Sequence, residues 1–561
     1  MSTLTEVADR RFDVTLAEAG QHGPPSSRHR TVEPQQRSRI LAKVLSITAV
    51  VGVLIWTVGE LGIGNRALVN GSGFGELTKF IRASYRPAIS IDLAKTVFDA
   101  TVITLAYAIV GTALSVCGGL AFGVLTTRAR HDNLGLSLFA RVVRVATIPI
   151  RGTHEVLWAL LFVNILGINP LVAVLAIALP FGAVSTRVFA ELFEAQPRGP
   201  FEVLRASGAR PWQSFFYGVF PNAARNLGSY AFYRFECAIR SSAVLGIVGA
   251  AGLGQQIFLS SLQPNYREMW TFIWPLIGLS AAADSVSSMV RRSGRTNPGR
   301  TARLIRRPAF ALAAMTVVAS MSWLKLGISI PTLWSKRTRK ELGFVRNTFL
   351  PPDLSADHLR VLWPAARQTV AISIGSIIVS LVLAAPLAFV TARITDATRI
   401  RRTAALVGRF FLLIARAIPP AVWAFLAVLV LFPGPLPATI ALGLYNAGVL
   451  GRLLAEVIEN LDHRPRRALR AAGARSSSIN AYATLPQAAP SFATYSLYRW
   501  EVAMRETIVV GVAAAGGLGA HIKQVMAAFA YDKLAGSVLV LLTITALVDI
   551  CSTRLRRKLL T

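Results

Sequence analysis

The sequence has few charged residues and very few cysteines. Charged residues make up 16% of the 561 residues, whereas hydrophobic residues make up 53%. A set of soluble domains of this total length needs a larger charged surface, so the composition excludes them and predicts an integral membrane protein. Three cysteines exclude a disulfide framework and a cysteine-based metal cluster. The first 40 residues lack an apolar core, so we expect no cleavable signal sequence.

Signatures of nucleotide binding and of metal catalysis are also missing. No Gly-x4-Gly-Lys-Ser/Thr phosphate loop occurs, so we expect this chain to bind no cofactor. The glycine-rich residues 247–254 follow an expected membrane helix and do not open a βαβ unit, which favours close helix packing or a gate hinge. His154-Glu155 lacks the second histidine of a metalloprotease helix, so we expect no metal site. Nothing in the sequence predicts chemistry on a substrate, and we expect that the chain is not an enzyme.

Acidic residues are scarce. There are 28 of them against 60 Lys and Arg, and the net charge is +32. In a soluble chain this excess favours nucleic-acid binding, but in a membrane protein it reports the retention of Lys and Arg in cytoplasmic loops. Basic segments lie at residues 291–308, around the loop after the second span and at residues 554–558. All fall on one side if each half crosses six times, so we expect both termini in the cytoplasm.

The strongest feature that is present is an internal repeat with a constant offset in residue number. Residues 204–210 (LRASGAR) recur as residues 469–475 (LRAAGAR), and the same offset carries Arg234 onto Arg499. A constant offset over so long a stretch indicates one unit duplicated in tandem. Such units usually pack about a pseudo-symmetry axis and build one site between them.

We expect an all-α membrane protein of two tandem, parallel six-helix units, or about twelve transmembrane helices. An even number of crossings relates the units by an axis along the membrane normal. The offset of the repeat gives the second set of spans from the first, which lies at residues 41–63, 98–126, 144–167, 170–195, 226–249 and 267–290. The expected domains are a disordered cytoplasmic tail at 1–38, a first unit at 39–290, a basic cytoplasmic linker at 291–308 and a second unit at 309–561.

A short loop between the fourth and fifth spans has the same pattern in both units. It contains small residues beside a glycine, and a proline follows that glycine at the same spacing in both copies. On a short exposed helix such residues form a low protrusion that fits a partner's groove, whereas the alternative is an ordinary amphipathic loop helix. The candidate docking residues are Glu202, Ala206, Gly208, Pro221, Ala471, Gly473 and Pro486.

This loop pattern resembles the coupling-helix motif of permease subunits of binding-protein-dependent ABC importers. The resemblance covers nearly the whole chain after the tail, once per unit. It implies a location in a bacterial inner membrane. It also implies that two copies of a separate ATPase, which bind ATP and Mg, dock at these loops, and that an extracytoplasmic substrate-binding protein delivers the ligand. The chain departs from the motif at Arg467, which stands where Glu202 stands, and at Gly218 and Ala483, where the family has a larger aliphatic residue.

The fifth span of each unit carries charges at a depth where they are costly. Arg234 and Arg240 lie about 13 Å and about 22 Å into the span, and each arginine at mid-membrane costs about 2.5–3.5 kcal/mol. We therefore expect these side chains to face the bundle interior or water. Glu236 and Arg240 are four residues apart and predict an ion pair. Arg234 and Arg499 lack a same-helix acid neighbour, which favours an anionic ligand or a neighbouring helix as their partner.

The third span has a charged motif in one unit only. Arg151 and Glu155 are four residues apart with His154 beside them, whereas the second unit keeps Arg416 but has two prolines in place of the His-Glu pair. We therefore expect a central site that is not truly two-fold. A lone intramembrane histidine more often makes a helix contact than binds a ligand.

The Tyr-Arg-Phe/Trp-Glu run, the arginine four residues beyond its glutamate and the Gly-Leu-Gly ending resemble the phosphonate-type branch of these permeases. The resemblance implies import of a phosphonate, phosphite, hypophosphite or phosphate by alternating access. Repeated arginines also suit an oxyanion held by charge-assisted hydrogen bonds. The expected substrate path comprises Arg151, His154, Glu155, Arg234, Glu236, Arg240, Ser241, Ser242, Arg416, Arg499, Glu501, Arg505 and Thr507.

Other interpretations remain open from the sequence. The same importer architecture serves other oxyanions, amino acids or quaternary amines, although an amine favours aromatic residues without arginines. An ion-coupled transporter predicts transport without an ATPase, and a membrane scaffold offers no reason to keep charges in matched spans. The loops near 64–97 and 329–362, which we expect to face outward, are basic and either guide an anion or form an ordinary solvated surface.

Overall fold

The computed structural model describes residues 48–64, 69–127, 134–296, 308–393, 399–514 and 516–560. The chain divides into two compact units, Met1–Trp56 and Thr57–Thr561, and only residues 48–56 of the first are described. The expected tail at 1–38 and residues 297–307 of the expected linker lie outside the described residues. All that follows concerns the larger unit, apart from the helix Thr48–Glu60, which begins in the smaller one.

This unit consists of helices, with one isolated β-bridge between Val69 and Leu431 among the described residues. The first repeat comprises α3 (Gly73–Ala83), α4 (Ile91–Thr126), α5 (Leu134–Gly152), α6 (Glu155–Leu166), α7 (Pro170–Glu194), α8 (Gly199–Ala206), α9 (Pro211–Ser214), η4 (Phe215–Val219), α10 (Phe220–Leu245), η5 (Gly246–Val248), α11 (Leu253–Leu262) and α12 (Tyr266–Thr296). The second comprises α14 (Pro308–Leu326), η6 (Ile330–Trp334), α15 (Lys336–Phe349), α16 (Ala356–Thr391), α17 (Arg399–Ala417), α18 (Pro420–Val430), α19 (Pro435–Glu459), α20 (Arg464–Ala471), α21 (Ser476–Ile479), η7 (Asn480–Thr484), α22 (Leu485–Ala514), α23 (Gly517–Ala527) and α24 (Tyr531–Leu560).

The offset that relates the two halves of the sequence also relates the two halves of the structure. Helices α16, α19 and α20 begin and end at the positions that this offset gives for α4, α7 and α8. Single hydrogen bonds follow the same rule. The Thr104 hydroxyl accepts from the Leu253 N–H at 2.9 Å, and the Thr369 hydroxyl accepts from the Leu518 N–H at 2.8 Å. The expectation of two tandem helical units is therefore confirmed down to individual contacts.

The two repeats exchange contacts through their last helices. Within each repeat the long second and fourth helices pack together, α4 against α7 and α16 against α19. Between repeats, α12 packs against α17 and α24 packs against α5. Since α5 and α17 also contact α7 and α19, each repeat contributes a helix to the wall of the other. Because of this arrangement, charged residues that are far apart in the sequence lie close together in the structure.

By length and hydropathy alone, five described helices can cross a membrane: α4, α7, α16, α19 and α24. The number rises to seven if two sharply bent pairs, α17 with α18 and α22 with α23, each count as one span. Three shorter apolar helices, at Thr48–Glu60, Glu155–Leu166 and Met315–Leu326, are below the length of a span. The expected twelve exceed this count, because several expected spans are broken and α10 has a low mean hydropathy with three internal arginines.

The expected span at 144–167 is one of those that are broken. Helix α5 ends at Gly152 and α6 begins at Glu155, with the His154 side chain accepting from the Val156 N–H at 3.3 Å. In the second repeat α17 and α18 meet at 95° next to Pro420, the first residue of α18. A proline at the start of a helix has no N–H to lose there, so it suits a new helix and ends the previous one.

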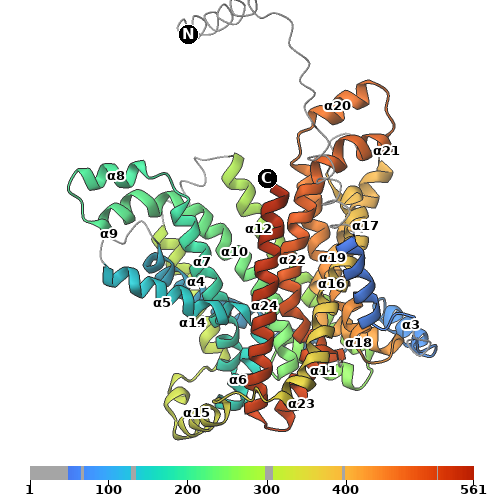
Figure 1. The fold of residues 1–561 in the computed structure, drawn as a ribbon, viewed down its shortest axis with the longest axis horizontal. Helices are drawn as coiled ribbons and strands as arrows, with labels where there is room; N and C mark the ends of the chain where they lie inside the picture. Colours follow the sequence, from blue (N-terminus) through green and yellow to red (C-terminus); the bar gives the residue numbers. More distant parts are fainter. Residues whose placement is uncertain are drawn as a thin grey trace, which may run out of the picture. The chain divides into compact units, whose positions relative to one another are not determined.

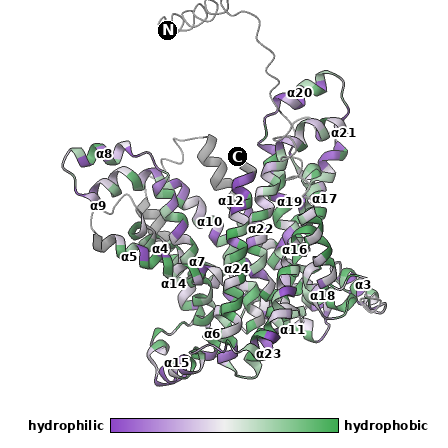
Figure 2. Cartoon of the chain, viewed as in Figure 1, coloured by the Kyte–Doolittle hydropathy of each residue, from purple (hydrophilic) through white to green (hydrophobic). Residues whose placement is uncertain are grey.

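The loops expected to face outward are also partly helical. They contain α3 and α15, and the Ser335 side chain begins α15 by accepting from the Thr338 N–H at 3.1 Å. Figure 1 shows α15 and α23 at the end opposite α8 and α20. Hydrophilic residues gather on α8, α20 and the C-terminal end of α24 at one end and on α15 at the other, with apolar helices between them (Figure 2).

Candidate functional site

A cavity of about 670 Å³ lies between the two repeats. Its walls come from the third, fourth and fifth spans of both repeats, namely α5–α6, α7 and α10 of the first and α17–α18, α19 and α22 of the second. Seven arginines and four glutamates line it, an excess of three positive charges: Arg151, Arg234, Arg240, Arg416, Arg452, Arg499, Arg505, Glu155, Glu236, Glu456 and Glu506. A cavity of this size and charge in a largely apolar protein favours an anionic occupant.

Most residues expected on the substrate path line this cavity, and three do not. Ser242 and Thr507 donate to backbone carbonyls on their own helices, those of Ile239 at 2.8 Å and Met504 at 2.7 Å. Glu501 is buried and accepts from Arg556 of α24 at 2.5 Å. The two hydroxyls are therefore satisfied within their own helices, Glu501 joins α22 to α24, and none of the three side chains lines the space between the repeats.

The fifth-span motif is used differently in its two copies. In the first repeat Glu236 accepts from Arg240 at 2.9 Å, so the expected ion pair is confirmed. In the second repeat Arg556 takes the carboxylate of Glu501, and Arg505 donates to the Arg151 carbonyl at 2.8 Å. Arg505 thus contacts the opposite repeat and has no carboxylate within 4 Å among the described residues.

Arg234 lies in an aromatic surround. Its Nε donates to the Tyr230 hydroxyl at 2.7 Å, and its guanidinium lies 5.0 Å from the ring centres of Tyr230 and Phe181. Tyr233 contributes a third ring at 5.9 Å. Aromatic faces stabilise a cation without neutralising it, so the positive charge remains available to a ligand. Over the described part of the chain, no carboxylate lies within 4 Å of this guanidinium.

Arg499, the equivalent of Arg234, is neutralised instead. It donates through Nε to the Asn446 side-chain oxygen at 2.9 Å, and its Nη2 lies 3.2 Å from the Glu506 carboxylate. The expectation that Arg499 lacks a same-helix acid was wrong, because Glu506 lies seven residues on along α22. The offset explains the difference, since Asn446 replaces Phe181 and Glu506 replaces Ser241.

The break between α5 and α6 places Glu155 apart from Arg151. Glu155 accepts from the Ser241 hydroxyl of α10 at 2.5 Å, and no ion pair joins it to Arg151. His154 lies 3.4 Å from the same carboxylate while its Nδ1 begins α6. The histidine is therefore a helix contact in this structure, although it also lines the cavity.

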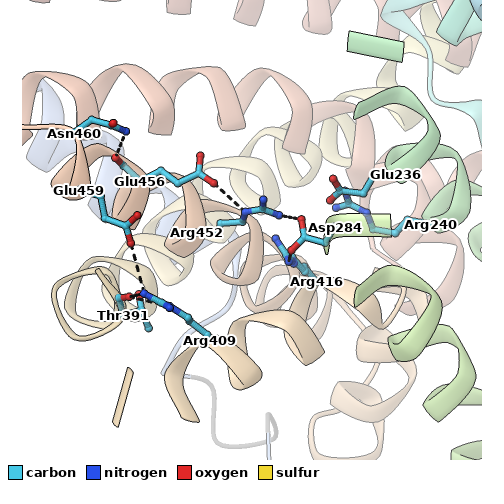
Figure 3. Close-up of polar contacts among 10 residues, drawn as sticks. All are labelled: Glu236, Arg240, Asp284, Thr391, Arg409, Arg416, Arg452, Glu456, Glu459 and Asn460. Atoms are coloured by element: carbon cyan, nitrogen blue, oxygen red, sulfur yellow. Dashed lines mark hydrogen bonds and ion pairs between the residues drawn. The ribbon is translucent and has the colours of Figure 1, made fainter. Parts of the chain in front are cut away.

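A further ion-pair network joins the repeats at one side of the cavity (Figure 3). Asp284 of α12 accepts from Arg416 of α17 at 2.6 Å and from Arg452 of α19, and Arg452 also donates to Glu456 at 3.1 Å. Asp284, Arg452 and Glu456 were not predicted from the sequence. A signal was present, because Arg452 and Glu456 repeat Arg187 and Glu191 at the constant offset.

The cavity arginines thus fall into two groups. Four of them are paired with carboxylates: Arg240, Arg416, Arg452 and Arg499. The other three, Arg151, Arg234 and Arg505, have no carboxylate within 4 Å among the described residues. Arg151 and Arg505 come from opposite repeats and are joined by the hydrogen bond between them. Two neighbouring cations without a counter-ion are a suitable environment for an oxyanion.

The candidate docking helices α8 and α20 are short, and neither contains a buried residue. Each is followed by a glycine in the left-handed conformation, Gly208 at φ 85° and Gly473 at φ 78°, which ends the helix. Pro221 and Pro486 lie in the first turn of α10 and α22, where the missing N–H is not needed. Both helices lie at the same end of the larger unit (Figure 1).

The docking residues of the two helices differ in charge. Glu202 lies on α8, whereas α20 carries four arginines, including Arg467 at the equivalent position, and no acid. Partial burial and the neighbouring Arg401 and Arg470 lower the pKa of Arg466 on α20. Gly218 packs against the backbone at the start of α8, where a Cβ would lie 3.2 Å from Pro200 and Phe201. A side chain at this position would therefore require a small shift of that backbone.

Comparison with known proteins gives one family and several relatives. The model of the family described as "Binding-protein-dependent transport system inner membrane component" matches residues 119–293 and 384–560, so the two matches begin at equivalent positions of the repeat. A protein named Phosphate-import permease protein PhnE, from Mycolicibacterium smegmatis, is 28% identical over 462 residues, which cover 81% of this chain and 84% of that protein. The Phosphite transport system permease protein PtxC of Stutzerimonas stutzeri is 35% identical over 208 residues, covering 37% of this chain and 74% of that protein.

Proposed function

This chain belongs to the family of binding-protein-dependent transport system inner membrane components, and on that premise we propose that it is the fused, two-unit permease of an ATP-driven importer for a phosphorus oxyanion. The observation that carries the proposal is the cavity between the repeats, where arginines outnumber glutamates by three. The names of the two relatives, one for phosphate and one for phosphite, support a phosphorus oxyanion over other anions. The positive excess disfavours a quaternary amine.

We assign the anion to the three arginines without carboxylate partners. Arg151 and Arg505 approach it from opposite repeats, and Arg234 contributes a charge held by aromatic rings. Hydrogen bonds that involve a charged group contribute about 1.5–3 kcal/mol each. A tetrahedral oxyanion has enough acceptor oxygens for all three guanidinium groups. Arg499, in contrast, is paired with Glu506 and joins α22 to α19 through Asn446.

Transport follows from the position of this cavity between the repeats. A substrate-binding protein delivers the anion at the end that carries α15 and α23. Two copies of an ATPase dock at α8 and α20, at the end that also carries the C-terminus, and this end is cytoplasmic in the proposal. ATP binding in those subunits moves the two repeats against each other, so that the cavity opens first to one side and then to the other. The chain itself performs no chemistry on the anion.

The proposal is tested with the chain reconstituted in proteoliposomes with its ATPase and binding protein. Phosphate, phosphite and methylphosphonate are titrated, and ATP hydrolysis and anion uptake are measured. We expect stimulation by at least one of these anions. Arg505→Ala and Arg234→Ala are expected to raise the half-saturating concentration about tenfold or more, which is the loss of about one charge-assisted hydrogen bond.

Arg187→Ala is the matched control. Arg187 belongs to α7, lies outside the cavity and forms an exposed pair with Glu191 at 2.7 Å. Its removal is expected to leave the half-saturating concentration unchanged. An assembled complex that no phosphorus anion stimulates refutes the substrate assignment. Uptake of the anion by the chain alone under an ion gradient favours the ion-coupled transporter instead.

A further inference from the structure

Asp284 joins two arginines that both line the cavity. It accepts from Arg416 at 2.6 Å and from Arg452, one through each carboxylate oxygen, and Figure 3 shows both guanidinium groups directed at it. Asp284 itself is not part of the cavity wall. Two guanidinium groups that converge on two oxygens of one anionic group form the arrangement that also recognises a phosphorus oxyanion.

The remaining contacts make this cluster neutral as it stands. Arg452 donates through Nε to Glu456 at 3.1 Å, so two arginines face two carboxylates. The side chains of Arg416, Asp284 and Arg452 are 10%, 21% and 24% exposed, so water screens the charges only partly. Without Asp284, Arg416 has no carboxylate within 4 Å in the described part of the chain, and the cluster becomes positively charged.

The equivalent contact on the other side of the cavity is open. Asp549, the repeat equivalent of Asp284, lies on α24, which packs against α5 as α12 packs against α17. Its equivalent partners are Arg151 and Arg187, and neither lies within 4 Å of it. Arg187 nevertheless keeps its pair with Glu191, as Arg452 keeps Glu456. One structure therefore holds the closed and the open form of the same aspartate contact.

Arg452 of this cluster also differs in depth from Arg505, one of the arginines assigned to the anion. Arg452 lies seven residues before the end of α19, which is about 10 Å from that helix end. Arg505 lies twenty residues after the start of α22, which is about 30 Å from that helix start. These two helix ends both adjoin the docking-helix segments, since α20 follows α19 and η7 precedes α22. Arg452 is therefore nearer than Arg505 to the end of the molecule that carries α8 and α20.

We propose that Arg416 and Arg452 form a second subsite for the phosphorus oxyanion, and that Asp284 is a tethered carboxylate that occupies this subsite in place of the anion. The inference rests on the proposed function and deepens it. When α12 moves away from α17, the two arginines receive the anion from the central cavity. When Asp284 returns, its negative charge displaces the anion toward the end that carries the docking helices. Movement of Asp284 thus makes release of the anion a step of the transport cycle. It also prevents the two exit arginines from retaining the anion.

The test is anion binding to the purified full-length chain in detergent. Binding of radiolabelled phosphate, phosphite and methylphosphonate is measured by equilibrium dialysis at constant ionic strength, with chloride as the balancing anion. The variants are Asp284→Ala, which leaves room for the anion, and Asp549→Ala as the matched control from the open side. We expect one bound anion per chain in the wild type and in Asp549→Ala, and two in Asp284→Ala.

Thermal unfolding provides the second readout. Asp284→Ala is expected to lower the Tm more than Asp549→Ala does, because only Asp284 neutralises two arginines. Phosphate is expected to raise the Tm of Asp284→Ala by at least twice the shift seen in the wild type. If Asp284→Ala does not fold, Asp284→Asn keeps the shape of the side chain without its charge and is measured in the same way.

The outcomes separate the inference from the function on which it rests. If the wild type binds an anion and the Asp284 variant binds no second one, the subsite is refuted while the importer assignment stands. If neither chain binds any of the three anions, the proposed function fails and the subsite fails with it. A second bound anion in Asp549→Ala as well shows that binding follows net charge alone, and this also overturns the proposal.

Discussion

Arg234 and Arg499 occupy equivalent positions, and the structure predicts opposite consequences for their removal. Arg499 is 7% exposed and is bonded to Asn446 and to Glu506, which is 8% exposed. Replacing Arg499 by glutamine leaves the Glu506 carboxylate buried without its cation. Breaking one partner of a buried ion pair costs about 3–5 kcal/mol of the free energy of unfolding.

Arg234→Gln leaves no carboxylate unpaired. It removes one hydrogen bond to Tyr230 and the contacts with the rings of Phe181 and Tyr230. Together these contacts contribute about 1–2 kcal/mol to the free energy of unfolding, once the cost of burying the Arg234 charge, which the variant no longer has, is subtracted. We therefore expect Arg499→Gln to destabilise the chain by about 1–4 kcal/mol more than Arg234→Gln does. Anion-stimulated ATP hydrolysis is expected to show the reverse order, with the larger loss of apparent affinity in Arg234→Gln.

The assay is denaturant unfolding of the detergent-solubilised chain, followed by fluorescence, for both single variants. The double variant Arg499→Gln/Glu506→Gln completes a cycle, because it removes both charges of the pair. We expect the double variant to be less destabilised than the sum of the two single changes, by about 0.5–3 kcal/mol. Equal destabilisation by Arg234→Gln and Arg499→Gln, together with additive behaviour in the cycle, refutes the assignment of Arg499 as a structural arginine.

Three further changes test other parts of the fold. Gly208→Ala, at φ 85° with open space around it, is expected to cost about 1–2 kcal/mol through backbone strain alone and to weaken co-purification of the ATPase, whereas Gly208→Asn is expected to retain more of it. Thr104→Val leaves the buried Leu253 N–H without its acceptor and is expected to lower the free energy of unfolding by about 1–3 kcal/mol, measured by denaturant titration. Glu501→Gln is expected to lower the Tm through loss of the Arg556 pair while leaving the half-saturating anion concentration unchanged in the uptake assay.

The repeat made much of the fold predictable. The offset located equivalent helices, and local spacing located the Glu236–Arg240 pair, because both depend on positions along one helix. The helix breaks after Gly152 and Ala417 were not predicted, since the apolar residues on the two sides of each break together have the length of a single span. The helices α3 and α15 were also missed, because short amphipathic segments in polar loops lack the length and hydropathy of a span.

The site was less predictable where partners come from different repeats. Asp284 reaches Arg416 and Arg452 only because α12 of one repeat packs against α17 of the other, and no periodicity along the chain contains that information. From the sequence, Arg556 was counted only among the basic C-terminal residues that indicate the orientation in the membrane. In the structure it forms an ion pair with Glu501. Positions at which the two repeats carry different residues would have predicted more of the site. Asn446 and Glu506 are two such positions, and they contact the arginine that is neutralised.

The substitution of Ser241 by Glu506 at equivalent positions has a consequence for how such a cavity can be tuned. In a symmetric homodimer every substitution occurs twice, so the charge of a shared cavity changes in steps of two. A carboxylate at both positions would neutralise both fifth-span arginines, and a serine at both would leave neither neutralised. In a single duplicated chain each half mutates alone, so the charge changes in steps of one. The excess of three charges in this cavity is an odd number, and a two-fold symmetric assembly cannot produce it.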